Sequence, residues 1–282
     1  MSIYTTLIEA EQLFENCTHP KWVIVDCRFD LANPDWGFLD YQTAHIPGSV
    51  YAHLDYDLSG SKTSLNGRHP LPDPLEFCQR IGKLGISNDS QVIVLDTVGG
   101  SFCSRLWWML RWLGHQAVAV LNGGLSAWKS HGYPVNSGIE MNPPAQFHGQ
   151  PDSKCLVSTK EIRALISDSN YKLLDARTPA RHRGEIEPYD TLAGRIPGSM
   201  NRFHENNLLP DGRLKPAATL RSEFTQLLAN TPPENVIVYC GSGVTACHHL
   251  LAMESAGIPG AKLYAGSWSE WIRDPNNPTE KG

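Results

Sequence analysis

A cysteine and a glycine-rich turn stand between a hydrophobic run and a stretch that can form a helix. Val236–Tyr239 is β-branched and aromatic, Cys240–Gly243 contains two glycines, and the residues from Val244 onward favour a helix. This order predicts a buried parallel strand, a tight turn and a helix start. The backbone N–H groups of such a turn, together with the helix dipole, favour a negative charge. We therefore expect Cys240 to be populated as the thiolate, the nucleophilic form of cysteine.

Two other interpretations of Cys240 compete with this one. Cys240 could be an inert thiol that ends a strand, because cysteine is among the most buried residue types. The small residues around it favour an accessible, reactive thiol instead. Cys240 could also be the nucleophile of a cysteine phosphatase, whose loop carries a phosphate-clamping arginine. Ala246 stands at that position, so phosphoryl transfer would lack its main electrostatic stabilisation.

The composition sets limits on the class of protein. The chain has 282 residues, a formal net charge of −5 and 41% hydrophobic residues, which suits one large or two ordinary domains and gives no reason to expect nucleic-acid binding. No apolar run approaches the roughly 20 residues of a membrane span, and the first residues lack the pattern of a secretory signal. The seven cysteines form no C-x-x-C pair, which argues against a zinc site and a thioredoxin-type redox pair. Reduced thiols of this kind predict a cytoplasmic protein.

The second half of the chain repeats the first. Four segments match in order: Trp22–Arg28 with Tyr171–Arg177, His45–Ser49 with Arg195–Ser199, Val92–Asp96 with Val236–Cys240, and Leu121–Trp128 with Leu263–Trp271. A single repeat of this length indicates two copies of a domain rather than a solenoid, whose repeats are far shorter.

Asp96 takes the position of Cys240 in the first copy. A carboxylate cannot do the chemistry of a thiolate, so we expect the first half to lack the nucleophile and to form one wall of a ligand cleft. The alternative is that Asp96 simply caps the turn that follows it.

Strands and helices alternate along each half. The main predicted helices are Glu9–Phe14, Pro74–Leu84, Ser104–Leu113, Thr159–Ser167, Ala218–Ala229 and Val244–Ala256. This alternation predicts an α/β fold with two domains, each a parallel sheet with helices on both faces. Ligands bind such sheets beyond the carboxyl ends of the strands, where Cys240 falls. Residues 139–154 are predicted to link an N-terminal domain (1–138) without the nucleophile to a catalytic C-terminal domain (155–282).

The loop Cys240-Gly241-Ser242-Gly243-Val244-Thr245-Ala246 resembles the active-site loop of the rhodanese superfamily, in particular that of the 3-mercaptopyruvate sulfurtransferases. The resemblance covers nearly the whole chain and implies a tandem rhodanese architecture with the nucleophile only in the second half. It implies that Cys240 takes a sulfur atom from a small-molecule donor, carries it as a persulfide and passes it to a thiol or to cyanide. No cofactor or metal is implied, and a thioredoxin-like reductant is a candidate partner.

The loop residues also bear on the choice of donor. Thiosulfate-preferring members carry two cations after the cysteine, whereas this chain has the neutral residues Gly241 and Ser242. The resemblance therefore favours the monoanion 3-mercaptopyruvate over the dianion thiosulfate. A thiosulfate:cyanide sulfurtransferase, or a persulfide carrier that delivers sulfur to a protein partner, remains the alternative. The backbone N–H groups of Gly241, Gly243, Val244 and Thr245 are expected to hold the thiolate, the persulfide and the substrate.

Arginine is the expected partner of the substrate carboxylate, because its fork matches that anion. The resemblance assigns this role to Arg181, and Arg177 is expected to form a structural ion pair with Glu185 or a neighbour. The family's second substrate arginine is missing, and Tyr189 stands near its place. Two arginines are candidates to replace it, Arg195 and Arg202, and Arg202 is preferred.

A proton relay is the last expected part of the site. The hydroxyl of Ser242 can donate to the sulfur or hand over a proton. The resemblance implies that a histidine and an aspartate assist it, and His45 with Asp35 or Asp40 matches that pattern best. The alternative is that His45 is a structural histidine in a turn.

Overall fold

The structure is a computed structural model that describes residues 3–229 and 231–282. The chain divides into two compact units that exchange short segments. The N-terminal unit contains the chain up to Gly60, Pro72–Asp152 and Pro210–Leu214. The C-terminal unit contains Ser61–Leu71, Ser153–Leu209 and Lys215–Gly282. The domains predicted from the sequence, 1–138 and 155–282, do not include the exchange of the segments 61–71 and 210–214. Their bounds stay a prediction.

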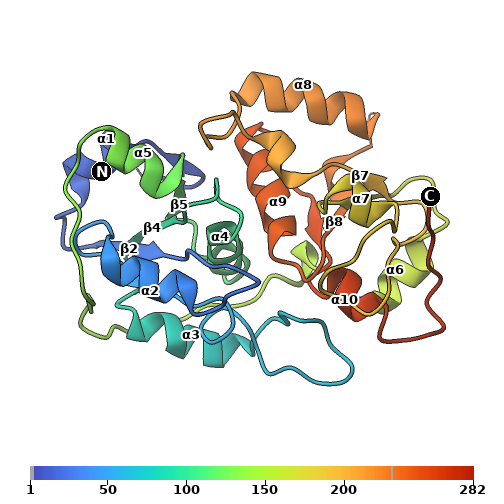
Figure 1. Cartoon of the computed structure of the whole chain (residues 1–282), viewed down its shortest axis with the longest axis horizontal. Helices are drawn as coiled ribbons and strands as arrows, with labels where there is room; N and C mark the ends of the chain where they lie inside the picture. The colour runs from blue at the N-terminus through green and yellow to red at the C-terminus, as the bar shows by residue number, and fades with distance from the viewer. Residues whose placement is uncertain (1–2, 230) are drawn as a thin grey trace. The chain divides into compact units, whose positions relative to one another are not determined.

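The N-terminal unit is built on a five-stranded parallel sheet in the order β1-β5-β4-β2-β3 (Figure 1). Its strands are β1 (Leu7–Ile8), β2 (Trp22–Asp26), β3 (Val50–Tyr51), β4 (Gln91–Leu95) and β5 (Val118–Leu121). Its helices are α1 (Ala10–Asn16), α2 (Trp36–Thr43), α3 (Pro74–Lys83), α4 (Cys103–Trp112) and α5 (Gly124–Ser130). The central strand β4 is buried along its whole length, as its unbroken hydrophobic run predicts.

The C-terminal unit has a four-stranded parallel sheet in the order β7-β6-β8-β9. Its strands are β6 (Lys172–Asp175), β7 (Met200–Asn201), β8 (Val236–Tyr239) and β9 (Lys262–Leu263). Its helices are α6 (Thr159–Leu165), α7 (Pro179–His182), α8 (Ala217–Leu228), α9 (Thr245–Ser255) and α10 (Ser267–Trp271), with 3-10 turns at Ser153–Cys155, His204–Asn207 and Pro233–Asn235. The predicted α/β fold with two parallel sheets is therefore confirmed.

The six predicted helices all form, with ends within a few residues of the predicted ones. Asp73 caps α3 by accepting from the backbone N–H groups of Leu75 and Glu76, and Ser158 forms a capping box with Glu161 at the start of α6. The helices α2 and α7 were not predicted; helices were expected after Gly124 and Gly266, where α5 and α10 form, but without bounds. These four helices are no longer than eight residues, too short to show a full amphipathic period.

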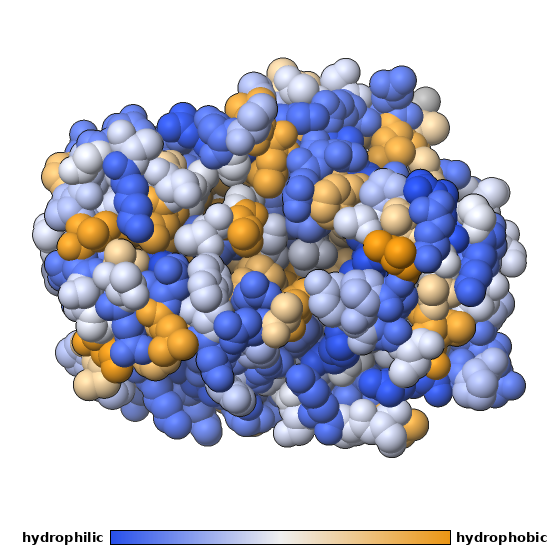
Figure 2. Space-filling model, viewed as in Figure 1, coloured by the Kyte–Doolittle hydropathy of each residue, from blue (hydrophilic) through white to orange (hydrophobic). Residues whose placement is uncertain are grey.

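Hydrophilic residues predominate on the face drawn in Figure 2, and hydrophobic ones are scattered among them. Such scattering is ordinary for a protein surface. Within residues 3–229 and 231–282, no helix is both long and apolar enough to cross a membrane. The same residues contain no cluster of three or more His, Cys, Asp or Glu side chains that could hold a metal ion.

At the carboxyl end of the central strands, the two sheets have equivalent registers. Asp26 pairs with Leu95 across β2 and β4, and Asp175 pairs with Tyr239 across β6 and β8. The next residue is Asp96 in one unit and Cys240 in the other. The structure thus places Asp96 and Cys240 at equivalent strand ends.

Asp96 fills its own loop. Its carboxylate accepts four backbone N–H groups, those of Val98 and Gly100 at 2.9 Å each, Phe102 at 2.8 Å and Cys103 at 3.0 Å. The capping interpretation of Asp96 is therefore confirmed. The loop retains its ability to bind an anion, and the anion is a side chain of the protein itself.

We expect Asp96→Ala to destabilise the N-terminal unit by about 3 kcal/mol, because buried N–H groups would lose a charged acceptor. Urea unfolding followed by tryptophan fluorescence measures the loss. Asp96→Asn, which keeps one acceptor oxygen, should lose less. A loss below about 0.5 kcal/mol for Asp96→Ala would show that water replaces the carboxylate.

Candidate active site

Cys240 lies between the end of β8 and the start of α9, and its residue is only 2% exposed. Its Sγ accepts the backbone N–H of Gly243 at 3.2 Å. Gly243 has a φ of 78°, and a β-carbon there would lie 2.2 Å from the carbonyl oxygen of Ala265. Only glycine can therefore occupy this position. The predicted roles of the Gly241, Val244 and Thr245 amides stay predictions.

The start of α10 holds the loop from the other side. The backbone N–H groups of Trp268 and Ser269 donate to the carbonyl oxygens of Cys240 and Gly241, at 3.0 and 2.8 Å. The Cys240 N–H in turn donates to Ser267 Oγ at 3.0 Å. Ser267 has a φ of 54°, a strained conformation for a residue with a side chain. Sequence reasoning missed Ser267, because a serine at the start of a helix is usually explained as a helix cap.

Ser242 forms a buried hydrogen bond with a histidine that sequence reasoning did not select. Its Oγ lies 2.7 Å from His69 Nδ1, and both residues are 4% exposed. His69 comes from the exchanged segment Ser61–Leu71. The expected partner, His45, belongs to the N-terminal unit, where Nδ1 contacts the carbonyl oxygen of Tyr41 at 2.7 Å and Nε2 lies 3.5 Å from Glu140. These contacts are those of a structural histidine.

Arg181 lies beside the loop, as predicted. A β-carbon built on Gly241 would lie 3.1 Å from Arg181 Nη2 and 3.4 Å from Nη1. Glu187 holds the guanidinium by accepting from Nε at 3.1 Å and from Nη2 at 2.7 Å. Thr178 caps the short helix α7 by accepting the Arg181 N–H. The guanidinium is thus fixed on one edge and turns the other toward the loop.

A second arginine reaches the same place. Arg68 Nη2 would lie 2.8 Å from the β-carbon built on Gly241. Arg68 forms an ion pair with Asp190. Its guanidinium carbon lies 5.5 Å from the centre of the Tyr189 ring. The Arg68 N–H also donates to Ser269 Oγ at 3.0 Å. Sequence reasoning missed Arg68 because no pattern near it points to Cys240.

The two arginines that sequence reasoning offered as replacements have other partners. Arg202 donates to Asn207 at 2.8 Å and pairs with Glu223 at 2.6 Å, and its guanidinium lies over the Phe224 ring. Arg195 pairs with Glu280. None of these contacts connects Arg202 to the cysteine loop, so its substrate role stays a prediction.

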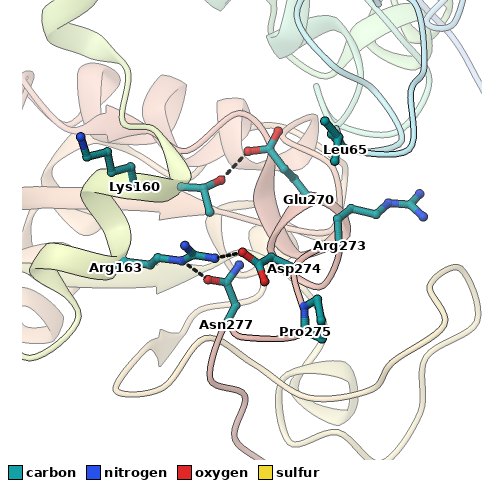
Figure 3. A pocket seen from close by; sticks show the side chains of 9 residues that line it. Leu65, Lys160, Arg163, Glu270, Arg273, Asp274, Pro275 and Asn277 are labelled. Carbon is teal, nitrogen blue, oxygen red and sulfur yellow. Dashed lines mark hydrogen bonds and ion pairs between the residues drawn. The ribbon is translucent and has the colours of Figure 1, made fainter.

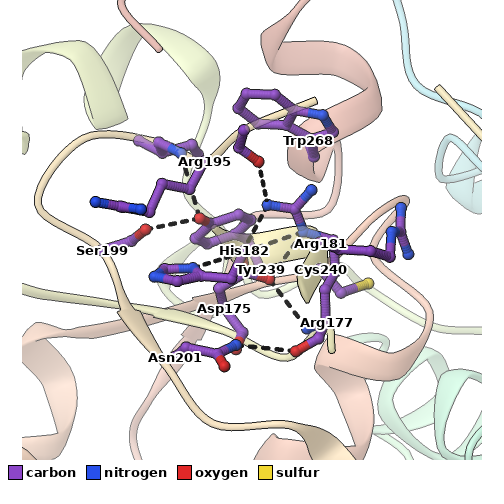
Figure 4. A network of polar contacts seen from close by, with 12 residues as sticks. Asp175, Arg177, Arg181, His182, Arg195, Ser199, Asn201, Tyr239, Cys240 and Trp268 are labelled. Atoms are coloured by element: carbon purple, nitrogen blue, oxygen red, sulfur yellow. Dashed lines mark hydrogen bonds and ion pairs between the residues drawn. The ribbon is translucent and has the colours of Figure 1, made fainter. Parts of the chain in front are cut away.

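A buried charge network lies behind the loop (Figure 4). Arg177 binds both oxygens of Asp175, and its Nη1 lies 3.3 Å from Glu187. His182 Nδ1 contacts Asp175 at 3.1 Å. Burial alone would raise the pKa of Asp175, but Arg177 and His182 outweigh it and hold that pKa well below its usual range. The predicted structural role of Arg177 is confirmed, with Asp175 and Glu187 as its partners instead of Glu185.

The C-terminal unit also contains a pocket of about 480 Å³ (Figure 3). Its lining includes Thr159, Arg163, Glu270 and Asp274, and it contains no cysteine or histidine. Thr159 donates to Glu270 at 2.5 Å, and Arg163 pairs with Asp274. These contacts occupy Glu270, Arg163 and Asp274, and we assign the pocket no chemistry.

Comparisons with known proteins agree with this geometry. A model of the rhodanese-like domain matches residues 9–131 and 158–274. A probable 3-mercaptopyruvate sulfurtransferase of Pseudomonas aeruginosa is 44% identical over 98% of both chains. A putative thiosulfate sulfurtransferase of Mycobacterium tuberculosis is 34% identical over 92% of this chain and 90% of its own. The solved structure of SseA from Escherichia coli, described as a 3-mercaptopyruvate sulfotransferase, is 31% identical with a TM-score of 0.82, over 95% of this chain and all of its own.

We expect Asp175→Asn to destabilise the protein by about 3–5 kcal/mol at pH 7, because it leaves Arg177 buried without its main partner. The pKa of Asp175 is lowered in the folded state, so its contribution is full above the unfolded pKa of about 3.9 and is lost as pH falls below it. The difference between wild type and variant should therefore shrink in acid, as measured by urea unfolding between pH 7 and pH 3.

Asp26→Asn is the matched control, because Asp26 pairs with Arg28 at the same strand end of the other unit. Burial raises the pKa of Asp26. The difference between wild type and this variant should grow as pH falls. Equal trends for both variants would contradict the assignment of the low pKa to Asp175.

Proposed function

The chain belongs to the rhodanese family and is a sulfurtransferase of the 3-mercaptopyruvate or thiosulfate type, and from this premise we propose that it takes sulfur from 3-mercaptopyruvate through a persulfide on Cys240. The observation that carries the proposal is the Cys240 Sγ in hydrogen bond with the Gly243 amide, on a loop with no cationic side chain of its own. A relative 44% identical over nearly the whole chain is named as a probable enzyme of this kind.

In the first step the Cys240 thiolate attacks the sulfur of the donor. The carbon–sulfur bond breaks, its electron pair stays on carbon, and pyruvate leaves as the enolate, which then takes up a proton. Cys240 is left as the persulfide. The Gly243 amide donates to the attacking sulfur before the step and stabilises its charge.

The Ser242–His69 pair provides a route for the proton. The Ser242 hydroxyl belongs to the same loop as Cys240, and the His69 imidazole can exchange a proton with it. General acid catalysis of this kind contributes roughly 10²- to 10⁴-fold to a rate. Arg181 presents its Nη groups to the substrate carboxylate.

In the second step an acceptor thiolate or cyanide attacks the outer sulfur of the persulfide. The sulfur–sulfur bond breaks and the Cys240 thiolate is regenerated, so no cofactor is consumed. Cytoplasmic thiols and a thioredoxin-like reductant are the proposed acceptors.

Thiosulfate is the second candidate donor, because several relatives are named as thiosulfate sulfurtransferases. The neutral Gly241 and Ser242 argue against a dianion, since neither adds a positive charge beside Cys240. Steady-state turnover with each donor, using cyanide as acceptor, decides between them. A persulfide carrier would give one equivalent of pyruvate and then stop until its protein partner is added.

We expect Cys240→Ser to abolish turnover with both donors while leaving the circular dichroism spectrum unchanged, because a hydroxyl cannot replace the thiolate as a sulfur acceptor. Mass spectrometry of the wild type after one donor addition should show one added sulfur on the peptide that contains Cys240. Turnover by Cys240→Ser would move the nucleophile elsewhere.

Ser242→Ala and His69→Gln should each lower kcat by about 10- to 100-fold, since each interrupts the same proton route. The double variant should lose little more than either single one, because residues that act as a unit are not additive. His45→Gln tests the histidine that the sequence suggested. A loss of kcat for His45→Gln and none for His69→Gln would reverse the assignment.

A further inference from the structure

Two arginines present nitrogen atoms to one point beside Cys240. The point is the outer face of Gly241, where an added β-carbon would lie 2.8 Å from Arg68 Nη2 and 3.1 Å from Arg181 Nη2. Like charges repel at such a short separation, so the protein must compensate them or use them to hold an anion. Because Gly241 has no side chain, both guanidinium groups can approach the loop beside Cys240 this closely.

Carboxylates hold both arginines from behind. Glu187 binds Arg181, while Asp190 pairs with Arg68 and lies 3.7 Å from Arg181 Nη2. The side chains of Glu187 and Asp190 are only 3% and 5% exposed. Those of Arg181 and Arg68 are 12% and 20% exposed. The positive groups are therefore the accessible side of this cluster, and the negative groups are its buried support.

The position of Arg68 does not depend on its own charge. Gly67 packs so closely on α10 that a β-carbon there would lie 2.7 Å from Ser269 Oγ and 2.8 Å from the Gly266 carbonyl oxygen. The Arg68 N–H donates to Ser269 Oγ, and the Asn66 carbonyl oxygen accepts from Arg273. These contacts fix the backbone of the segment, so a changed side chain at residue 68 leaves it docked.

Tyr189 completes the arrangement. Its ring lies 5.1 Å from the Arg181 guanidinium and 5.5 Å from that of Arg68. An aromatic ring stabilises a neighbouring cation through its π electrons. Tyr189 stands near the place where the family resemblance implies a second substrate arginine, and here its ring contacts two arginines.

We propose that Arg68, together with Arg181, binds the carboxylate of the sulfur donor, and that Asp190 sets the charge of this site so that it prefers a monoanion. The proposal rests on the proposed function and names the residues that select the donor. The three arginines 68, 177 and 181 are balanced by the three carboxylates 175, 187 and 190. A monoanionic keto acid adds one negative charge to this balanced site, whereas thiosulfate adds two.

Donor binding is measured by calorimetry in the Cys240→Ser background, where sulfur transfer cannot proceed. We expect Arg68→Gln to raise the Kd of 3-mercaptopyruvate at least tenfold, and Arg68→Lys to raise it less, because lysine keeps the charge without the fork. Arg183→Gln is the matched control. This variant removes one positive charge, two residues after Arg181, from an exposed ion pair with Glu185. It should change the Kd less than twofold.

Asp190→Asn tests the charge balance. It adds one net positive charge to the site at nearly constant shape, and this charge attracts a dianion more than a monoanion. The ratio of kcat/KM for thiosulfate to kcat/KM for 3-mercaptopyruvate should rise about tenfold, which corresponds to about 1.4 kcal/mol. An unchanged or lower ratio would overturn the role of Asp190.

The outcomes separate this inference from the proposed function. If wild type turns over 3-mercaptopyruvate but Arg68→Gln and Arg183→Gln bind it equally well, the inference fails and the function stands. If wild type shows no turnover but its Cys240→Ser form binds 3-mercaptopyruvate in an Arg68-dependent way, the site stands and the function fails. Should Arg68→Gln not fold, Arg68→Lys and Asp190→Asn decide in the same assays.

Discussion

The buried carboxylate of Asp175 is the constraint on which the charged part of the site depends. A carboxylate at the end of a buried strand must be paired, because an isolated charge in such a place costs several kcal/mol. Asp175 is paired by Arg177 and His182, and Arg177 in turn binds Glu187. Glu187 then fixes Arg181. The requirement to neutralise one buried acid therefore extends, through alternating charges, to the Arg181 guanidinium beside the cysteine loop.

The two halves of the chain use the same loop in different ways. In the N-terminal unit the loop amides bind the carboxylate of Asp96. In the C-terminal unit an amide of the equivalent loop binds the sulfur of Cys240. The two copies thus keep the same kind of loop, and the residue at the strand end decides whether a carboxylate or a sulfur accepts its backbone N–H groups. This explains how one copy can carry an aspartate and the other a cysteine on the same structure.

Sequence reasoning predicted the local features well. The strand, loop and helix around Cys240 and the α/β fold follow from residues close together in the chain, whereas the expectation for Arg181 came from the family resemblance. The sequence suggested His45 as the partner of Ser242, whereas the structure shows Ser242 hydrogen-bonded to His69. The preference for Arg202 has no support in its contacts with Glu223 and Asn207. The residues that the sequence missed beside the loop, Arg68 and His69, come from a segment far away in the chain.

The amino-acid sequence by itself determined the strand–loop–helix setting of Cys240 and the replacement of that cysteine by Asp96 in the first copy. These features depend on hydrophobic runs, glycines and the repeat, which act over a few neighbouring residues. Only the tertiary structure decided that Ser61–Leu71 joins the C-terminal unit and brings Arg68 and His69 to Cys240. That docking depends on close backbone packing of Gly67 and on the hydrogen bond to Ser269. Contacts of this kind follow no periodic pattern, because they join positions that are far apart in the chain and near only after folding.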